Sequence, residues 1–160
     1  MPQFMIRWET CKRAFSEFIG EGSLRDIYVL DTTIEDWRTL FAQLQIRFKL
    51  SYVVDGTDRQ LPLTVDEIFA TREQACPTLS FLVGDIWVVT HFFTPDEIEF
   101  DIAARDVTSQ ASLDHLLGFL QLIGDTVRRT VLLTPENDER HPCITYNPVQ
   151  GEFAFYKSAT

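Results

Sequence analysis

The chain has 160 residues, of which 45% are apolar and 12% aromatic, and its 24 acidic and 14 basic side chains give a net charge of −10 at pH 7. A chain of this length and apolar content can bury a core without a metal or disulfides, and its composition excludes the disordered class. Nucleic acids and anionic membranes bind clustered cations, so neither is expected as a partner. No apolar run approaches the roughly 18 residues of a membrane span.

Nothing in the sequence divides the chain, because it contains no repeat, low-complexity tract or linker rich in Pro, Gly or Ser. Residues 1–160 are therefore expected to form a single domain. Cys11, Cys76 and Cys143 are odd in number and scattered, which is typical of reduced thiols rather than of a disulfide framework. Since residues 1–7 also lack the basic stretch and apolar core of a secretory signal, the expected location is cytoplasmic.

The first elements along the chain are strands and one clear helix. A short strand is expected at 4–8, an amphipathic segment of undecided type at 11–19, and a β-prone strand at 24–30. Thr33 and Asp36 form a capping box, which begins a helix with one apolar stripe. The stripe consists of Ile34, Trp37, Leu40, Phe41 and Leu44.

Beyond this helix the sequence predicts hairpins. Strand 48–54 should turn at Asp55-Gly56 into a return strand at 59–63, whose proline places it at a sheet edge. A second capping box, from Thr64 to Glu67, starts a short helix.

The next two strands, 78–83 and 86–93, are joined by the turn Gly84-Asp85. Because the second of them is apolar on both faces, it is expected to be central in the sheet and covered on both sides. His91 is then expected to be a hydrogen-bonded core histidine, with a role in a site as the alternative.

Strict alternation of apolar and acidic residues at 97–102 predicts a strand with one buried and one acidic face. The acidic residues here are Asp96, Glu97, Glu99 and Asp101. A long helix at 109–129 follows, in which Phe119 and Leu122 lie off the main apolar stripe. This second apolar face either is buried or serves as the contact of a homodimer or of another partner.

Short strands at 131–133, 143–146 and 152–156 complete the chain. The order strand–helix–strands–helix–strands separates the helices from runs of consecutive strands. It predicts an α+β fold, a mostly antiparallel curved sheet with two main helices packed on one face.

The acidic strand is the first candidate site. Glu97, Glu99 and Asp101 repeat in steps of about 6.5–7 Å on one face, which suits a surface that binds a basic protein, together with Asp96 beside them. The same spacing would suit a two-carboxylate hydrolase or a Mg²⁺ or Ca²⁺ site. A solvated strand that resists edge pairing is the simplest alternative.

The aromatic strand is the second candidate. Trp87, His91 and Phe93 alternate with inward residues, so they would line a groove or pocket beside the acidic strand if the helices leave one face uncovered. Packing in the core is the alternative. His141 and Cys143 are the closest pair of soft ligands, short of the four of a structural zinc site, so no metal is expected.

No catalytic residue is identified, because no motif pairs a nucleophile with a base, and no cofactor is expected, because phosphate-binding loops are absent. These features favour a small acidic protein-binding module over an enzyme. In general character only, it resembles bacterial immunity or inhibitor proteins, which neutralise a basic partner by charge complementarity. The alternatives are a small-molecule-binding protein or enzyme with a pocket between sheet and helices, and a protein that self-assembles through helix 109–129.

Overall fold

The computed structural model describes residues 6–15 and 23–157. In this part of the chain, nine strands form one open antiparallel sheet in the order β3-β2-β4-β5-β6-β1-β7-β8-β9. The strands are β1 (Leu24–Leu30), β2 (Ser51–Val54), β3 (Thr57–Asp58), β4 (Pro77–Val83), β5 (Ile86–Thr90), β6 (Glu97–Ala103), β7 (Val131–Pro135), β8 (Ile144–Asn147) and β9 (Glu152–Phe155). The helices are α1 (Trp8–Cys11), α2 (Ile34–Arg47), α3 (Val65–Arg72) and α4 (Gln110–Val127), with 3₁₀ turns η1 (Lys12–Phe15) and η2 (Ala104–Asp106).

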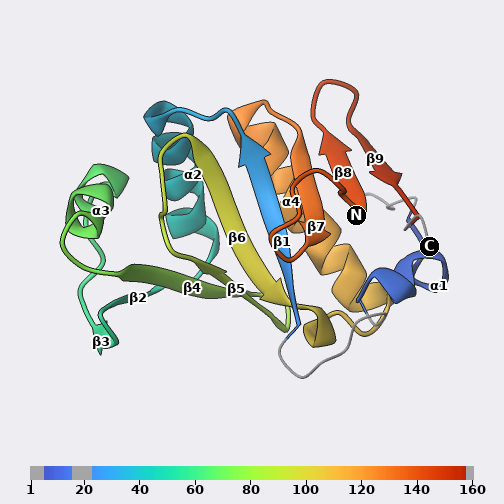
Figure 1. Cartoon of the computed structure of the whole chain (residues 1–160), viewed down its shortest axis with the longest axis horizontal. Coiled ribbons are helices and arrows are strands. Elements are labelled where there is room, and N and C mark those ends of the chain that lie inside the picture. Colours follow the sequence, from blue (N-terminus) through green and yellow to red (C-terminus); the bar gives the residue numbers. More distant parts are fainter. Residues whose placement is uncertain (1–5, 16–22, 158–160) are drawn as a thin grey trace.

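The two long helices, α2 and α4, lie side by side behind the sheet, on the same face (Figure 1). The short helix α3 lies beside the β2–β4 end of the sheet. The long helices therefore cover one face, while the connection between β7 and β8 is the described segment that crosses the other (Figure 1). The α+β architecture expected from the order of elements is confirmed.

Both long helices begin at capping boxes. In α2 the Thr33 hydroxyl accepts the amide of Asp36, whose carboxylate accepts the amide of Thr33 in return. In α4 Ser109 has the same exchange with Ser112. The Arg128 backbone then adopts a left-handed conformation that closes α4.

Aromatic rings fill the layer between sheet and helices. Trp37 of α2 and Phe119 of α4 meet rings that rise from the sheet and from the segment after β5, with centroids 5.2–6.2 Å apart. The other rings in this group are Phe81, Phe92 and Phe100. All five side chains are at most 2% exposed, so this layer is a packed core.

Several local predictions differ from the structure. The strand expected at 48–54 begins only at Ser51, because α2 continues to Arg47, and the strand expected at 86–93 ends at Thr90, before the left-handed residue Phe92. The chain enters helix α1 at Trp8, so the strand expected at 4–8 is wrong where it is described, while residues 4 and 5 lie outside the described residues. The amphipathic segment begins at Cys11, the last residue of α1, and continues as the 3₁₀ turn η1, while residues 16–19 lie outside the described ranges. The return strand expected at 59–63 is replaced by β3, because Pro62 has no amide hydrogen for a ladder.

Strand β5 is central, as expected, but the prediction that it is covered on both sides is wrong. Ile86 and Val88 are fully buried, whereas Trp87 is 52% exposed. Both long helices lie on the face of the sheet that carries Ile86. The apolar residues of the strand could not indicate which face the helices would cover. His91 is not a core residue either, since its side chain is 38% exposed. It precedes Phe92, whose left-handed backbone (φ +54°) turns the chain away and carries its ring into the core.

Candidate functional site

The candidate site is the sheet face opposite α2 and α4, called here the open face. Strand β6 divides its residues between the two faces by strict alternation, as predicted. Its buried residues are Ile98, Phe100 and Ile102, and its open-face residues are Glu97, Glu99 and Asp101. The acidic row therefore lies where no helix covers it.

Strand β1 places a second acidic group against this row. In the antiparallel register Asp101 faces Asp26, and Glu99 faces Tyr28. Side chains that face each other across strands have Cβ atoms about 4.5–5.5 Å apart. The Asp26 carboxylate accepts hydrogen bonds from the Tyr28 hydroxyl at 3.0 Å and from the backbone amide of Asn137 at 2.7 Å. Asp26 is only 2% exposed. This buried carboxylate is thus fixed in place beside its neighbours.

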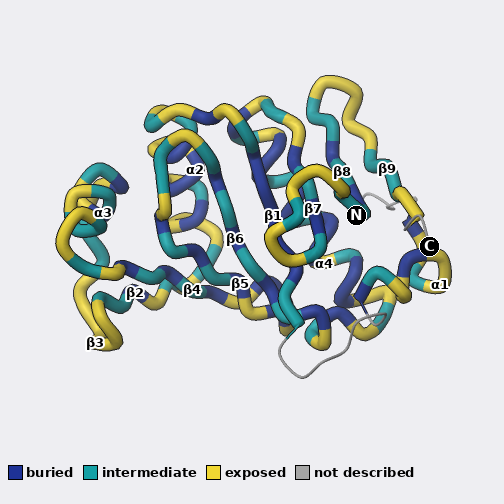
Figure 2. The backbone as a smooth tube through the Cα atoms, viewed as in Figure 1, coloured by how far each residue is buried: buried dark blue, intermediate teal, exposed yellow. Residues whose placement is uncertain are grey.

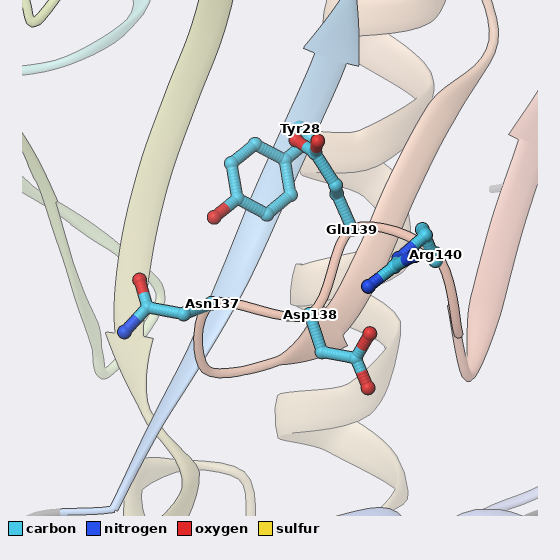
Figure 3. Close-up of a pocket in the computed structure, with 5 residues that line it drawn as sticks. All are labelled: Tyr28, Asn137, Asp138, Glu139 and Arg140. Atoms are coloured by element: carbon cyan, nitrogen blue, oxygen red, sulfur yellow. The ribbon is translucent and has the colours of Figure 1, made fainter.

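The β7–β8 loop, residues 136–143, crosses in front of β1 and forms a cleft of about 570 Å³ with it. Figure 3 shows Asn137 pointing toward β6, Glu139 rising alongside Tyr28, and Asp138 pointing the other way. The tip of the loop is exposed, in contrast to the strand beneath it (Figure 2). The residues that line the cleft are Tyr28, Asn137, Asp138, Glu139 and Arg140.

Burial and like charges together change the acidity of these groups. Burial, then a hydrogen bond and repulsion from Glu139, raise the pKa of Glu97 to about 7. Burial, then the charges of Asp26 and its neighbours on β6, raise the pKa of Glu99 to about 7. Burial also raises the pKa of Asp101, although the nearby His91 opposes the shift. Near pH 7, the face therefore holds protons that ordinary glutamates have already released.

Tyr28 shares this environment. Its pKa is raised, first by burial and then by Asp26 and Glu99, so its hydroxyl remains a hydrogen-bond donor. It supplies a neutral aromatic wall to an otherwise anionic cleft.

Apolar side chains occupy the β4–β5 part of the open face. Trp87 faces Leu82 across the hairpin, and these two residues are 52% and 45% exposed. Val89 lies next to Asp101 in register, which places the aromatic strand directly beside the acidic one. Phe93 is 53% exposed and continues the apolar side chains beyond the end of β5.

His91 joins the apolar and acidic parts of the open face, because it contacts both Asp101 and Phe93. His91 Nε2 lies 3.7 Å from the Asp101 carboxylate, and its Nδ1 lies 3.3 Å from the Thr78 hydroxyl. The His91 ring packs at 5.4 Å from that of Phe93, over which the Arg72 guanidinium lies at 5.0 Å. The sequence-predicted residues Trp87, His91, Phe93, Glu97, Glu99 and Asp101 are thus brought to one surface.

Asp96 is the exception. It precedes β6 in an exposed turn, where its amide is bound by the Thr94 hydroxyl and its carbonyl accepts the amide of Thr32. Sequence analysis missed Asp26, Tyr28 and Glu139. A signal for Asp26 existed, because a charged residue in the middle of an apolar strand needs a buried partner or a site.

The other candidate chemistries have little support in the described part of the chain. Burial raises the pKa of the Cys11 and Cys143 thiols to about 11, which keeps them in the unreactive protonated form. No group of three or more His, Cys, Asp or Glu side chains among the described residues could hold a metal ion. A second cleft, of about 400 Å³, lies away from the open face and is lined by Arg47, Phe48, Val83, His115, Gly118, Phe119 and Leu122.

Comparisons of the chain with protein-family models, with curated proteins and with solved structures give no match. Among residues 6–15 and 23–157, no helix has both the length and the apolar character needed to cross a membrane. The chemistry of the open face is therefore the basis for a functional assignment.

Proposed function

We propose that this protein is a protein-binding module that docks a basic partner on its open face. The observation that carries the proposal is the composition of this uncovered surface. Exposed Trp87 lies on β5, the strand next to β6 and its carboxylates, with Leu82 opposite it on β4 and Phe93 just after β5. Large aromatic side chains supply much of the binding energy at protein interfaces, while complementary charge selects the partner and speeds its association.

The alternative of a small-molecule pocket between sheet and helices has less support. The rings of the aromatic core fill the middle of that layer, and the acidic cleft lies on the other side of the sheet. The second cleft, of about 400 Å³, opens between the end of α2, β4 and α4, and its lining is mostly apolar, with Arg47 and His115 as its polar side chains. Phe119 is 2% exposed and is therefore not available for self-assembly through α4. Of the two residues off the main apolar stripe, this leaves Leu122, which is partly exposed.

We place this activity in the cytoplasm, where thiols remain reduced. The three cysteines are unpaired, which fits this proposal.

Affinity capture with matched surface variants tests the proposed function. Wild-type protein would be immobilised and exposed to lysate of its source cells, beside Trp87→Ala and the control Ile46→Ala. Ile46 is 77% exposed on α2, so its truncation also removes an exposed apolar side chain, but on the helical side. We expect a basic protein that wild type and Ile46→Ala retain at low salt, that Trp87→Ala loses, and that high salt releases.

Equal capture by wild type and both variants would assign the interaction to another surface. Retention in high salt would contradict the role of charge, because screening weakens contacts between exposed charges. Size-exclusion chromatography of the purified protein measures its oligomeric state, and thus shows separately whether the protein self-associates, as the alternative role of α4 requires.

A further inference from the structure

The open face carries more negative charge than its neighbouring cations balance, and this imbalance lies at one place. The carboxylates of Asp26 on β1 and Asp101 on β6 face each other across the two strands. The β7–β8 loop adds the carboxylate of Glu139, which lies next to Glu97. Like charges directly opposite each other in a sheet are destabilising. Burial and these neighbouring charges raise the pKa values of Glu97 and Glu99, so proton uptake by the two glutamates relieves part of the repulsion.

The charged and titratable groups around Glu97 and Glu99 come from every element packed against them. They are Asp26 and Tyr28 of β1, Asp101 of β6, His91 after β5, and Glu136, Asp138, Glu139, Arg140 and His141 of the β7–β8 loop. Carboxylates predominate in this set. The cleft, which is lined by Tyr28 and loop residues 137–140, adjoins both glutamates, because Glu97 contacts Glu139 and Glu99 faces Tyr28. Strand β6 lies between this cleft and the exposed apolar side chains of β4 and β5. A cation that enters the cleft would interact favourably with the ionised carboxylates and not with the protonated ones.

We propose that the basic partner inserts lysine or arginine side chains into this cleft as its apolar residues contact Trp87 and Leu82, and that docking is coupled to deprotonation of Glu97 and Glu99. This inference rests on the function proposed above. The released protons pass to the solvent, so binding tightens as the pH rises across neutrality. The raised pKa values of the two glutamates set this range, because ordinary glutamates are fully ionised well below it.

A synthetic peptide serves as the probe. The peptide (Lys-Leu-Lys-Gly)₃ carries cationic and apolar side chains, and a rhodamine label reports binding through fluorescence anisotropy. Its lysines remain charged between pH 5.5 and 8, so any pH dependence in this range arises from the protein. The peptide (Glu-Leu-Glu-Gly)₃ controls for apolar contacts alone.

For wild type we expect a Kd about tenfold lower at pH 8 than at pH 5.5, since each linked proton contributes up to tenfold per pH unit. Glu97→Gln/Glu99→Gln should bind more weakly at pH 8 and show little change with pH. The matched control is Glu35→Gln/Asp114→Asn, which removes two acids from α2 and α4 on the opposite side of the sheet. It should keep the wild-type pH profile.

Protonation of histidines would also weaken the binding of a cation as the pH falls, so it would give the same sign of pH dependence as protonation of the glutamates. The variant His91→Gln/His141→Gln separates these two causes. A pH profile that disappears in this variant, but persists without the two glutamates, would overturn the proposal. Binding of equal strength at every pH would overturn the coupling to deprotonation and leave the proposed docking intact. Absence of binding at any pH would overturn both. Thermal melting confirms that each variant is folded, and the single variant Glu99→Gln replaces the double variant if the latter fails.

Discussion

The two faces of the sheet are made by the same strands and differ in nearly every physical property. On β6, Phe100 is fully buried and touches three other rings, while its neighbour Glu99 lies on the open face opposite Tyr28 and close to other carboxylates. One face is covered by α2 and α4, and the other is only partly overlaid by a loop (Figure 1). The neighbouring residues Phe100 and Glu99 therefore lie in environments that respectively stabilise and destabilise the fold.

This difference separates the roles of the two faces. Burial of apolar area on the covered face supplies the free energy of folding. The open face concentrates like charges, exposed aromatic rings and raised pKa values, a combination that is common at functional sites. Variants on the two faces should accordingly affect different measurements.

The largest effect is expected from Phe100→Ala. Loss of a fully buried ring that contacts Trp37, Phe81 and Phe119 should lower the free energy of unfolding by about 3–5 kcal/mol. The matched variant is Glu99→Gln, one residue away on the other face, which should not destabilise the fold at pH 7. Urea denaturation followed by circular dichroism measures both. A similar loss from both variants would show that the open face also carries stability.

A smaller loss is expected where Gly124 of α4 packs closely against β8. A methyl group on Gly124 of α4 would lie 2.5 Å from the buried Tyr146 ring of β8. Gly124→Ala should therefore destabilise by about 1–3 kcal/mol through overpacking, although alanine favours a helix by about 1 kcal/mol. In a Tyr146→Leu background the cost should shrink, which a double-mutant cycle in urea would reveal. An unchanged cost would place the strain elsewhere.

Local chemistry was enough to predict much of the covered face. The capping box at Thr33 fixed the start of α2, and strict alternation in β6 assigned Phe100 inward and Glu99 outward. The helix predicted at 109–129 is observed at Gln110–Val127. Each of these features depends on residues that are neighbours in the sequence.

The composition of the open face depended on long-range packing. Apolarity on both sides of β5 suggested double coverage, and only the position of the helices leaves Trp87 exposed. The path of the β7–β8 loop over β1 joins the backbone amide of Asn137 to the Asp26 carboxylate, 111 residues away in the chain. No local pattern predicts such a contact, so Glu139 was not included in the predicted site.

The open face should also give stability a measurable pH dependence. The folded-state pKa values of Glu97 and Glu99 are about 7, above the ordinary value of 4.5. Their contribution to stability is thus fully present below pH 4.5 and is lost as the pH rises through 7. At pH 8, Glu97→Gln/Glu99→Gln should melt about 2–4 °C above wild type, an estimate already reduced for solvent screening.

Differential scanning calorimetry from pH 5 to pH 8 provides this test. The melting temperature of wild type should fall more steeply with pH than that of the double glutamine variant, and Glu35→Gln/Asp114→Asn should follow wild type. Parallel curves for wild type and the double glutamine variant would mean that the two glutamates titrate normally in the folded protein.

The smallest effect on stability is expected from Trp87→Ala, although it removes one of the largest side chains in the protein. About half of this residue is exposed, so its truncation should change the free energy of unfolding by less than about 1 kcal/mol. Its neighbour in sequence, Val88, is fully buried, and Val88→Ala should cost more despite the smaller loss of volume. Urea denaturation of the two variants compares the faces at adjacent positions. If Trp87→Ala proved the more damaging, the tryptophan would be part of the core, and the open face would lose its apolar anchor.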